Sequence, residues 1–162
     1  MFQLDGHISI ELASYLSLAD LTGLAQARES PPKRLIPLDP VKVSAGFPSP
    51  AADYEDGRLD LNEYLIRNPV STFFFPVQGD SMEGAQIFDG DLLVVDRSVR
   101  ASHGSIVIAF VNGERLVKRL HLSSDRVALV AENPRYPPLE IAEGIELMVW
   151  GVVVGKFRRL PV

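Results

Sequence analysis

The sequence predicts a mainly β protein that carries an extended N-terminal arm. Three observations support this prediction. Beyond residue 70, short runs rich in Val, Ile and Phe are bounded by Gly, Asp, Asn and Pro, which is typical of strands joined by turns. Asn112-Gly113 stands between two such runs. Six of the twelve prolines fall between residues 31 and 50, where they favour extended backbone that is poor in regular structure.

The apolar runs predict six strands and one well-defined hairpin. The strands are expected at residues 72–78, 91–96, 105–111, 114–121, 126–131 and 146–157. Asn112-Gly113 is the strongest hairpin signal, because a two-residue type I′ turn needs positive φ at both positions. Trp150 is expected to be a core residue rather than part of a site.

The N-terminal region has a different pattern. Helical spacing predicts a short amphipathic helix, carried by Ile8, Leu12, Tyr15, Leu16 and Ala19. Glu11 and Asp20 interrupt the apolar residues 8–27 and no Lys or Arg precedes them, which argues against a signal peptide or a membrane span. The chain has no cysteine, which excludes a disulfide framework and thiolate catalysis and agrees with a cytoplasmic location.

Length and charge limit the classes of function. A chain of 162 residues is long enough for one sizeable core and short for two domains. The net charge of −5, with no basic stripe to offset it, argues against direct DNA binding. The scattered histidines and acidic residues show no metal-ligand spacing, and no nucleotide fingerprint is present, so neither a metal nor another cofactor is expected.

Lys118 is the first residue with unusual chemistry. Strand alternation places it on the same face as Leu116 and Leu120. A lysine on an apolar face must be paired, extend to an edge, or lose its proton through a lowered pKa. From the alternation alone, the ordinary reading is a lysine whose amine reaches solvent.

Ser81 is the second candidate. It lies in Gly79-Asp80-Ser81-Met82-Glu83, a polar turn that follows a predicted strand. Most serines in such turns cap a helix or stabilise the turn. The backbone N–H groups of Ser81 and Met82 could instead form an oxyanion hole beside the hydroxyl, which would make Ser81 a candidate nucleophile.

A nucleophilic serine needs a base, and the three histidines fit that role poorly. His7 lies in the arm, His103 lies in a predicted turn, and His121 should face the side of its strand opposite to Lys118. A neutral lysine can replace histidine if burial brings its pKa from about 10.4 to roughly 7. Lys118 is therefore the best available base.

At this point the chain resembles a known family, the self-processing UmuD-like proteins, with LexA and phage repressors as more distant relatives. The resemblance covers residues 43–159. Ser81 and Lys118 are 37 positions apart, and Ser81 follows Gly46 by 35, which equals the family spacing. The matching motifs are Ala45-Gly46-Phe47-Pro48-Ser49-Pro50-Ala51-Ala52-Asp53-Tyr54, Gly79-Asp80-Ser81-Met82, Asp89-Gly90-Asp91-Leu92-Leu93, Val117-Lys118 and Tyr136.

The resemblance implies a LexA/UmuD-type serine peptidase fold of twisted, largely antiparallel sheets. It implies that Ser81 attacks the carbonyl of Ala45, with Lys118 as general base, and that the chain cuts its own Ala45-Gly46 bond. The expected regions are an arm of residues 1–45 that is removed, a linker of 46–70, and a peptidase domain of 71–162.

The resemblance also implies partners. A RecA filament on single-stranded DNA would stimulate the cut, and the product would form a homodimer and associate with a UmuC-like error-prone DNA polymerase in the SOS response. Two alternatives stay open: a LexA-like transcriptional regulator or binding modulator of RecA or a polymerase, and a Ser/Lys signal peptidase, which normally carries membrane anchors. About twenty additional N-terminal residues precede the usual arm, and the resemblance assigns them no role.

Overall fold

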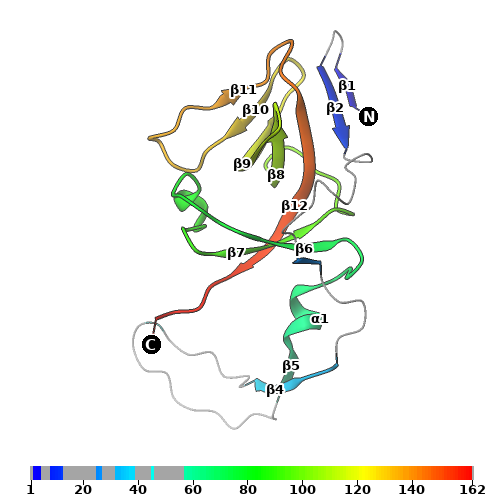
Figure 1. The fold of residues 1–162 in the computed structure, drawn as a ribbon, viewed down its shortest axis with the longest axis vertical. Coiled ribbons are helices and arrows are strands. Elements are labelled where there is room, and N and C mark those ends of the chain that lie inside the picture. The colour runs from blue at the N-terminus through cyan, green and yellow to red at the C-terminus, as the bar shows by residue number, and fades with distance from the viewer. Residues whose placement is uncertain are drawn as a thin grey trace.

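The computed structural model describes residues 2–4, 8–12, 25–26, 32–38, 45 and 57–161. Most strands belong to one ten-stranded sheet, and a separate two-stranded sheet lies at one end of the molecule (Figure 1). Every pairing is antiparallel except the parallel contact between β2 and β12. The predicted mainly β, largely antiparallel fold is therefore confirmed.

All six predicted strands are present, with ends displaced by one or two residues. They are β6 (Thr72–Pro76), β7 (Leu92–Asp96), β8 (Ile106–Val111), β9 (Glu114–Leu122), β10 (Val127–Val130) and β12 (Leu147–Phe157). A two-residue strand, β11 (Leu139–Glu140), pairs with β10 and was not predicted. The path through the sheet runs β11-β10-β9-β8-β12-β7-β6-β3.

The predicted hairpin joins β8 to β9. Asn112 and Gly113 have φ values of 48° and 84°, and Val111 pairs with Glu114. Both turn residues thus adopt the left-handed conformation that a type I′ turn requires. The hairpin fixes the register of β9 and places Lys118 opposite Val107.

Strand β12 is long enough to pair with β7 and β8 in addition to β2. Its first half pairs with β8 and its second half with β7, and the register shifts once along each side. At the first shift lies Gly151, where an added Cβ would come within 2.8 Å of a Val95 methyl. A glycine at this position allows the two strands to approach closely.

Two buried clusters lie on the two faces of β8. Val107, Ala109 and Val111 belong to the first cluster, whereas Ile108 belongs to the second. This explains why the sequence of β8 is continuously apolar rather than alternating. Trp150, 2% exposed, lies in the second cluster with edge contacts to Phe73 and Phe75, so the prediction of a core role is confirmed.

The described part of the N-terminal region consists of short strands. They are β1 (Phe2–Leu4), β2 (Ile8–Leu12) and β3 (Ala25–Gln26). The predicted helix is wrong over residues 8–12, because Ile8, Ile10 and Leu12 alternate with Ser9 and Glu11 in the period of two that suits a strand. The other residues that suggested the helix, Tyr15, Leu16 and Ala19, lie outside the described residues.

The two-stranded sheet is formed by β4 (Leu35–Leu38) and β5 (Gly57–Asp60), and helix α1 (Leu61–Leu65) follows directly. We call residues 32–38 and 57–65 the β4–α1 region. Residues 32–38, the main described part of the proline-rich stretch, thus contain a regular strand where little regular structure was expected. The boundaries expected at residues 45 and 70 stay a prediction.

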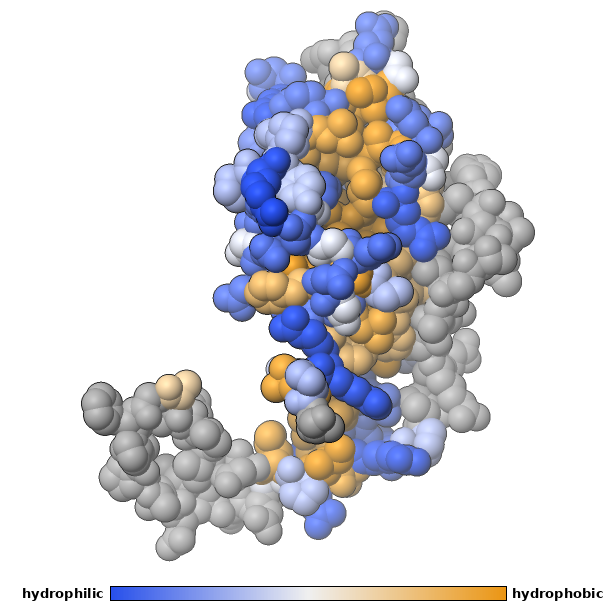
Figure 2. Space-filling view, turned by 60° about the vertical axis from the view of Figure 1, so that its left-hand side comes forward, coloured by the Kyte–Doolittle hydropathy of each residue, from blue (hydrophilic) through white to orange (hydrophobic). Residues whose placement is uncertain are grey.

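The β4–α1 region is sparsely packed. Asp60 is buried, whereas every residue of β4 is exposed and α1 buries none of its side chains. Figure 2 shows apolar residues at the surface of this lower part of the molecule. The exposed large hydrophobic side chains of this region are Leu35, Ile36, Leu38, Leu61 and Tyr64.

Candidate functional site

Ser81 lies in a turn whose two ends are hydrogen bonded to each other. After β6, the N–H of Val77 donates to the carbonyl of Asp91 at 2.8 Å, and the N–H of Gly90 donates back to Val77 at 3.0 Å. Gly79, at a φ of 92°, donates its N–H to Asp89 Oδ1 at 2.7 Å. The chain therefore reverses direction within a closed loop, and Ser81 lies inside it.

The residues after Ser81 anchor this turn in the second core cluster. Met82 is 1% exposed and packs with Phe75, Val77 and Ile87. A short 3₁₀ helix, η2 (Glu83–Ala85), follows and ends at Gln86, which has a left-handed φ of 60°. The buried side chain of Met82 anchors the backbone next to Ser81 and so holds the Ser81 hydroxyl in place. Ser81 itself is half-buried.

Strand β9 brings Lys118 to this turn. Lys118 Nζ lies 2.6 Å from Ser81 Oγ, although the two residues are 37 positions apart. In the residues that the structure describes, no carboxylate lies within ion-pair distance of Lys118. Burial lowers the pKa of Lys118, because desolvation disfavours its charged form and no anion compensates.

The pair opens into a cavity of about 350 Å³. Seven apolar residues line it together with the polar residues Gln78 and Arg115, and the Arg115 guanidinium lies over the ring of Phe75. A second cavity, about 410 Å³, lies beside Trp150 and contains neither Ser81 nor Lys118. Chemistry at the pair would therefore take place in the smaller cavity, which is lined by Phe75, Pro76, Val77, Leu93, Ile108, Leu116 and Val117.

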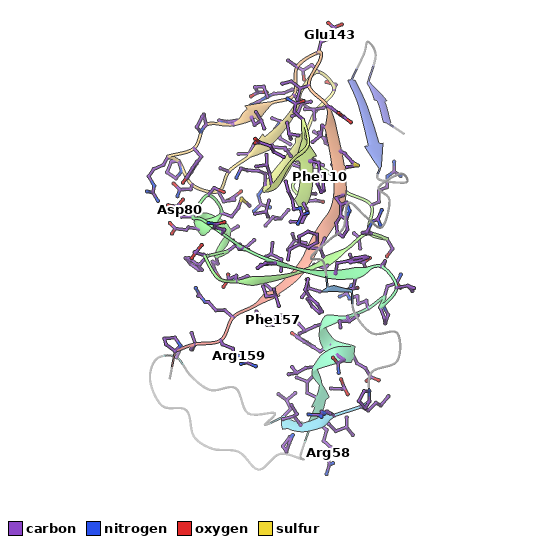
Figure 3. The ribbon with its side chains drawn as sticks, viewed as in Figure 1. Arg58, Asp80, Phe110, Glu143, Phe157 and Arg159 are labelled. Carbon is purple, nitrogen blue, oxygen red and sulfur yellow. The ribbon has the colours of Figure 1, made fainter. Side chains whose placement is uncertain are left out.

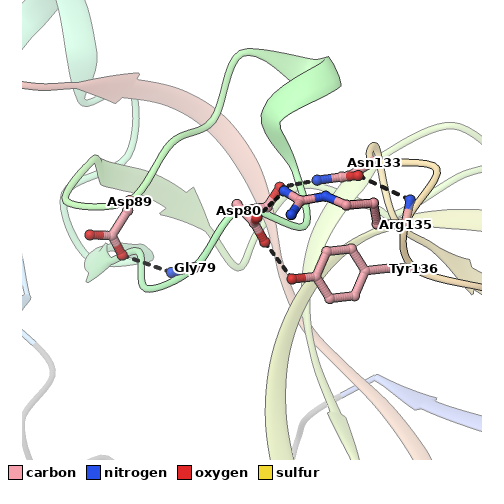
Figure 4. Close-up of polar contacts among 6 residues, drawn as sticks. All are labelled: Gly79, Asp80, Asp89, Asn133, Arg135 and Tyr136. Atoms are coloured by element: carbon pink, nitrogen blue, oxygen red, sulfur yellow. Dashed lines mark hydrogen bonds and ion pairs between the residues drawn. The ribbon is translucent and has the colours of Figure 1, made fainter.

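Asp80, directly before Ser81, is bound by the loop between β10 and β11 (Figure 4). Its carboxylate accepts hydrogen bonds from the Tyr136 hydroxyl and the Arg135 guanidinium, and its main-chain carbonyl accepts one from Asn133 Nδ2 at 3.0 Å. The bond from Tyr136 and the charge of Arg135 lower the pKa of Asp80, whereas the carboxylate raises the pKa of Tyr136. Asp80 is therefore held as an anion beside a neutral phenol.

The described histidines do not contact the pair. His103 and His121 contact each other with ring centroids 4.7 Å apart, and His103 Nδ1 accepts the N–H of Leu122 at 3.1 Å. His7 lies outside the described residues. A lysine, not a histidine, is thus bonded to Ser81.

The expected scissile bond is described only on one side. Ala45 is exposed and lies in a bend, and Gly46 lies outside the described residues. Ala45 is not among the residues that line the cavity of the Ser81-Lys118 pair. The role of Ala45 and Gly46 stays a prediction.

Comparison with known proteins places the chain in a family. The family model described as Peptidase S24-like matches residues 37–154, a span that includes both Ser81 and Lys118. The chain belongs to this family. S24-like proteins include self-cleaving serine peptidases, so the expectation of a self-cleaving serine peptidase is confirmed.

Individual relatives narrow the placement within the S24-like family. The chain is 48% identical to Protein MucA of Salmonella typhimurium over 128 residues, which cover 78% of this chain and 87% of MucA. It is 46% identical to Protein SamA of the same species over 136 residues, 84% of this chain and 94% of SamA. The LexA repressor of Xylella fastidiosa is 38% identical over 117 residues, 72% of this chain and 55% of the repressor.

These relatives confirm the resemblance to the UmuD-like proteins of SOS mutagenesis, and LexA is the more distant relative, as expected. This S24-like chain is therefore a UmuD-like SOS mutagenesis protein. In the described part of the chain, no helix is long and apolar enough to cross a membrane.

Sequence reasoning missed the contacts of Asn133. The run from Asn133 to Pro138 is rich in residues that are typical of turns. The amide of Asn133 is 53 positions from the carbonyl it binds, and nothing local to either residue signals that contact. A buried Asn at a turn is a weak signal, because Asn favours turns for its own backbone bonding.

Proposed function

We propose that Ser81 and Lys118 cut the chain's own Ala45-Gly46 bond and that this cut activates the protein for SOS mutagenesis. The observation that carries the proposal is the 2.6 Å contact between Lys118 Nζ and Ser81 Oγ. A nucleophile and a base within hydrogen-bond distance are the first geometric requirement of covalent catalysis. The half-buried position of Lys118 supplies the second requirement, a lowered pKa.

The reaction follows from the two groups. Neutral Lys118 accepts the Ser81 proton as Oγ bonds to the Ala45 carbonyl carbon, and a tetrahedral oxyanion forms. Lys118 then donates that proton to the Gly46 nitrogen, the C–N bond breaks, and Ala45 remains as an ester on Ser81. Water hydrolyses the ester with Lys118 again as base, which regenerates Ser81 and releases a carboxylate at Ala45.

The oxyanion needs donors, and we assign this role to the backbone N–H groups of Ser81 and Met82. Among the described residues, neither N–H has a hydrogen-bond acceptor. Free donors beside the nucleophile suit an oxyanion, since such groups are already oriented before charge develops.

Substrate delivery is the remaining requirement. The Ala45-Gly46 bond belongs to the connection between β4 and β5, so it is tethered to its own catalyst. Tethering raises the effective concentration of the bond, which allows a weak catalyst to suffice. A small residue at Ala45 and a glycine after it permit close approach of the backbone to Ser81.

The biological setting is proposed from the UmuD-like placement. Residues 1–45 are the removed arm, 46–70 the linker, and 71–162 the peptidase domain. A RecA nucleoprotein filament stimulates the cut in the cytoplasm, and the product forms a homodimer that joins a UmuC-like polymerase. No direct DNA binding is part of this proposal, because the net charge is −5.

The test is self-cleavage of the purified full chain at alkaline pH, and separately with RecA filaments, followed by intact mass spectrometry. The unaltered chain should yield a fragment that begins at Gly46, and Ser81→Ala and Lys118→Ala should each reduce its formation by more than about 1000-fold. Ser105→Ala is a matched control, since Ser105 lies outside the pair. A Gly46 fragment from either alanine variant at the unaltered rate would refute the mechanism.

A further inference from the structure

We propose that Asn133 is a positioning residue that orients the peptide unit between Asp80 and Ser81, so that the Ser81 N–H faces the oxyanion of self-cleavage. The inference rests on the proposed function, because it takes Ser81 as the nucleophile. It adds a residue from the loop between β10 and β11.

Asn133 is built into the structure rather than placed loosely on its surface. Its side chain is 7% exposed. Nδ2 donates to the main-chain carbonyl of Asp80 at 3.0 Å, and Oδ1 accepts the N–H of Arg135 at 3.0 Å (Figure 4). Both ends of the amide are therefore used, which fixes the orientation of its plane.

The bond to Asp80 controls the direction of the next N–H group. A peptide unit is planar and, in the described residues, always trans, so its C=O and N–H point to opposite sides. Asn133 holds the carbonyl of the Asp80-Ser81 unit on the side of its own loop. The N–H of Ser81 must consequently point away from that loop, and no described residue accepts it.

A second donor to the same carbonyl is weaker. The N–H of Glu83 reaches the Asp80 oxygen at 3.3 Å, within the turn itself. This bond belongs to the local 3₁₀ geometry and does not connect the turn to another element. Asn133 thus supplies the long-range constraint on this peptide unit.

The same loop also contacts the strand of the base. Glu132 accepts the N–H of Gly84 at its main-chain oxygen, at 2.6 Å, and its carboxylate binds Arg119, the neighbour of Lys118. Residues 132 and 133 therefore join the turn of Ser81 to β9. Of these contacts, the bond from Asn133 acts on the peptide unit that ends at the Ser81 nitrogen.

The contacts to the Asp80 carboxylate differ in kind. Arg135 is 66% exposed at its side chain, and such exposed ion pairs contribute little. Loss of the Arg135 side chain leaves the Asn133 bond in place, because Asn133 accepts the main-chain N–H of Arg135. Arg135→Ala is therefore a matched control from the same loop.

The decisive variant is Asn133→Asp. It keeps the size of the side chain and the acceptor for Arg135, but it replaces the donor to Asp80 with an acceptor. We expect the plateau rate of self-cleavage at alkaline pH to fall by about tenfold or more, since one oxyanion donor loses its orientation. In Asn133→Ala, which adds no charge, the pH midpoint of the cleavage rate should not move, because Lys118 is untouched. Arg135→Ala should stay within about twofold of the unaltered rate.

A second measurement separates positioning from general damage. In the Ser81→Cys background the introduced thiol is the only one in the chain, and its alkylation by iodoacetamide forms no oxyanion. Adding Asn133→Asp should leave this alkylation rate unchanged while cleavage falls in the Ser81 chain. Asn133→Ala, which adds no charge beside Asp80, should reproduce both results.

Two results would overturn the inference. One is equal cleavage rates in the unaltered chain and in both Asn133 variants. The other is an alkylation rate that falls as far as the cleavage rate, which would mean that Asn133 acts on the nucleophile or on the fold. Failure of the proposed function is recognised separately, because then the unaltered chain itself would not produce the Gly46 fragment.

Discussion

The turn of Ser81 and the β4–α1 region are held in opposite ways. Contacts with several elements fix the turn: Met82 packs in the core, Gly84 bonds to the backbone of Glu132, and Asn133 bonds to the backbone of Asp80. The β4–α1 region has a single buried residue, Asp60, among exposed apolar side chains. In Figure 3, Asp80 lies beside the loop of β10 and β11, whereas Arg58 of β5 lies at the lower end of the molecule.

This difference indicates that the Ser81-Lys118 pair is assembled before the substrate bond reaches it. The pair already makes its 2.6 Å contact, while Ala45 is exposed and does not line the cavity of the pair. A preorganised site needs no rearrangement at the moment of reaction. If the pair cuts the Ala45-Gly46 bond as proposed, the adjustable step is the approach of that bond, and a sparsely packed region next to it suits a step that a partner controls.

The largest effect is expected from a change that forces the turn away from its support. In Gly84→Ala, the added Cβ would lie 2.5 Å from the main-chain oxygen of Glu132, and backbone cannot yield as a flexible side chain does. We expect self-cleavage to become undetectable and the free energy of unfolding to fall by about 1–3 kcal/mol. Denaturant melts and intact mass measure both.

Gly155→Ala is the matched control for Gly84→Ala. Its added Cβ would meet nothing closer than 3.7 Å, the γ-methyl of Val94, and so should leave cleavage and stability nearly unchanged. Unaltered cleavage in Gly84→Ala would show that the turn adapts and is not held as rigidly as the structure indicates.

A smaller, graded effect on the self-cleavage rate is expected from a change in pH. Burial lowers the pKa of Lys118, so the neutral base becomes populated below the pH at which an exposed lysine deprotonates. The cleavage rate should rise about tenfold per pH unit and then level off at the pKa of Lys118. Single-turnover rates between about pH 7 and about pH 10 would measure this curve.

The β4–α1 region should not contribute to that curve. The pKa of Asp60 is lowered by backbone hydrogen bonds, first from Arg34, and the pKa of Lys33 is raised, first by its hydrogen bond to Glu63. Both groups keep their charge across the alkaline range.

A self-cleavage rate that stays constant as the pH rises, while the circular dichroism spectrum is unchanged, would contradict Lys118 as the base.

The features that could be predicted from the sequence are those that depend on neighbouring residues in the chain. The strands from β6 to β12 follow from local signals, alternation and turn residues, and Asn112-Gly113 was confirmed in detail. Lys118 could be selected as the general base because a charged lysine among apolar neighbours is unfavourable in free energy, which favours the neutral form. Its partnership with Ser81 needed the family spacing, since 37 residues separate them and no local pattern joins them.

Other features could not be predicted, because their partners are distant. The bond from Asn133 to Asp80 spans 53 positions. Strand β2 pairs with β12 at the far end of the chain, and its short apolar sequence fitted helical spacing as well as alternation. Short strands are selected by what they pair with, so tertiary pairing decided against the helix there.

The smallest effect is expected from Asp60→Ala, which loosens the β4–α1 region alone. Asp60 caps α1 by accepting the N–H groups of Asn62 and Glu63, and it also accepts the N–H of Arg34 ahead of β4. Losing this cap should raise the rate of trypsin cleavage at Lys33 and Arg34 about fivefold, which is the change in an opening equilibrium that the free energy of a typical helix cap corresponds to. Self-cleavage should change less than tenfold, because the Ser81-Lys118 contact lies in the other region.

The control for Asp60→Ala is Glu63→Ala, which removes only the exposed ion pair with Lys33 and should leave trypsin cleavage unchanged. If Asp60→Ala stopped self-cleavage as completely as Gly84→Ala, the two regions would be coupled in the uncut chain. Delivery of the scissile bond and assembly of the pair would then be one event, and a partner could not control delivery without also disturbing the catalyst.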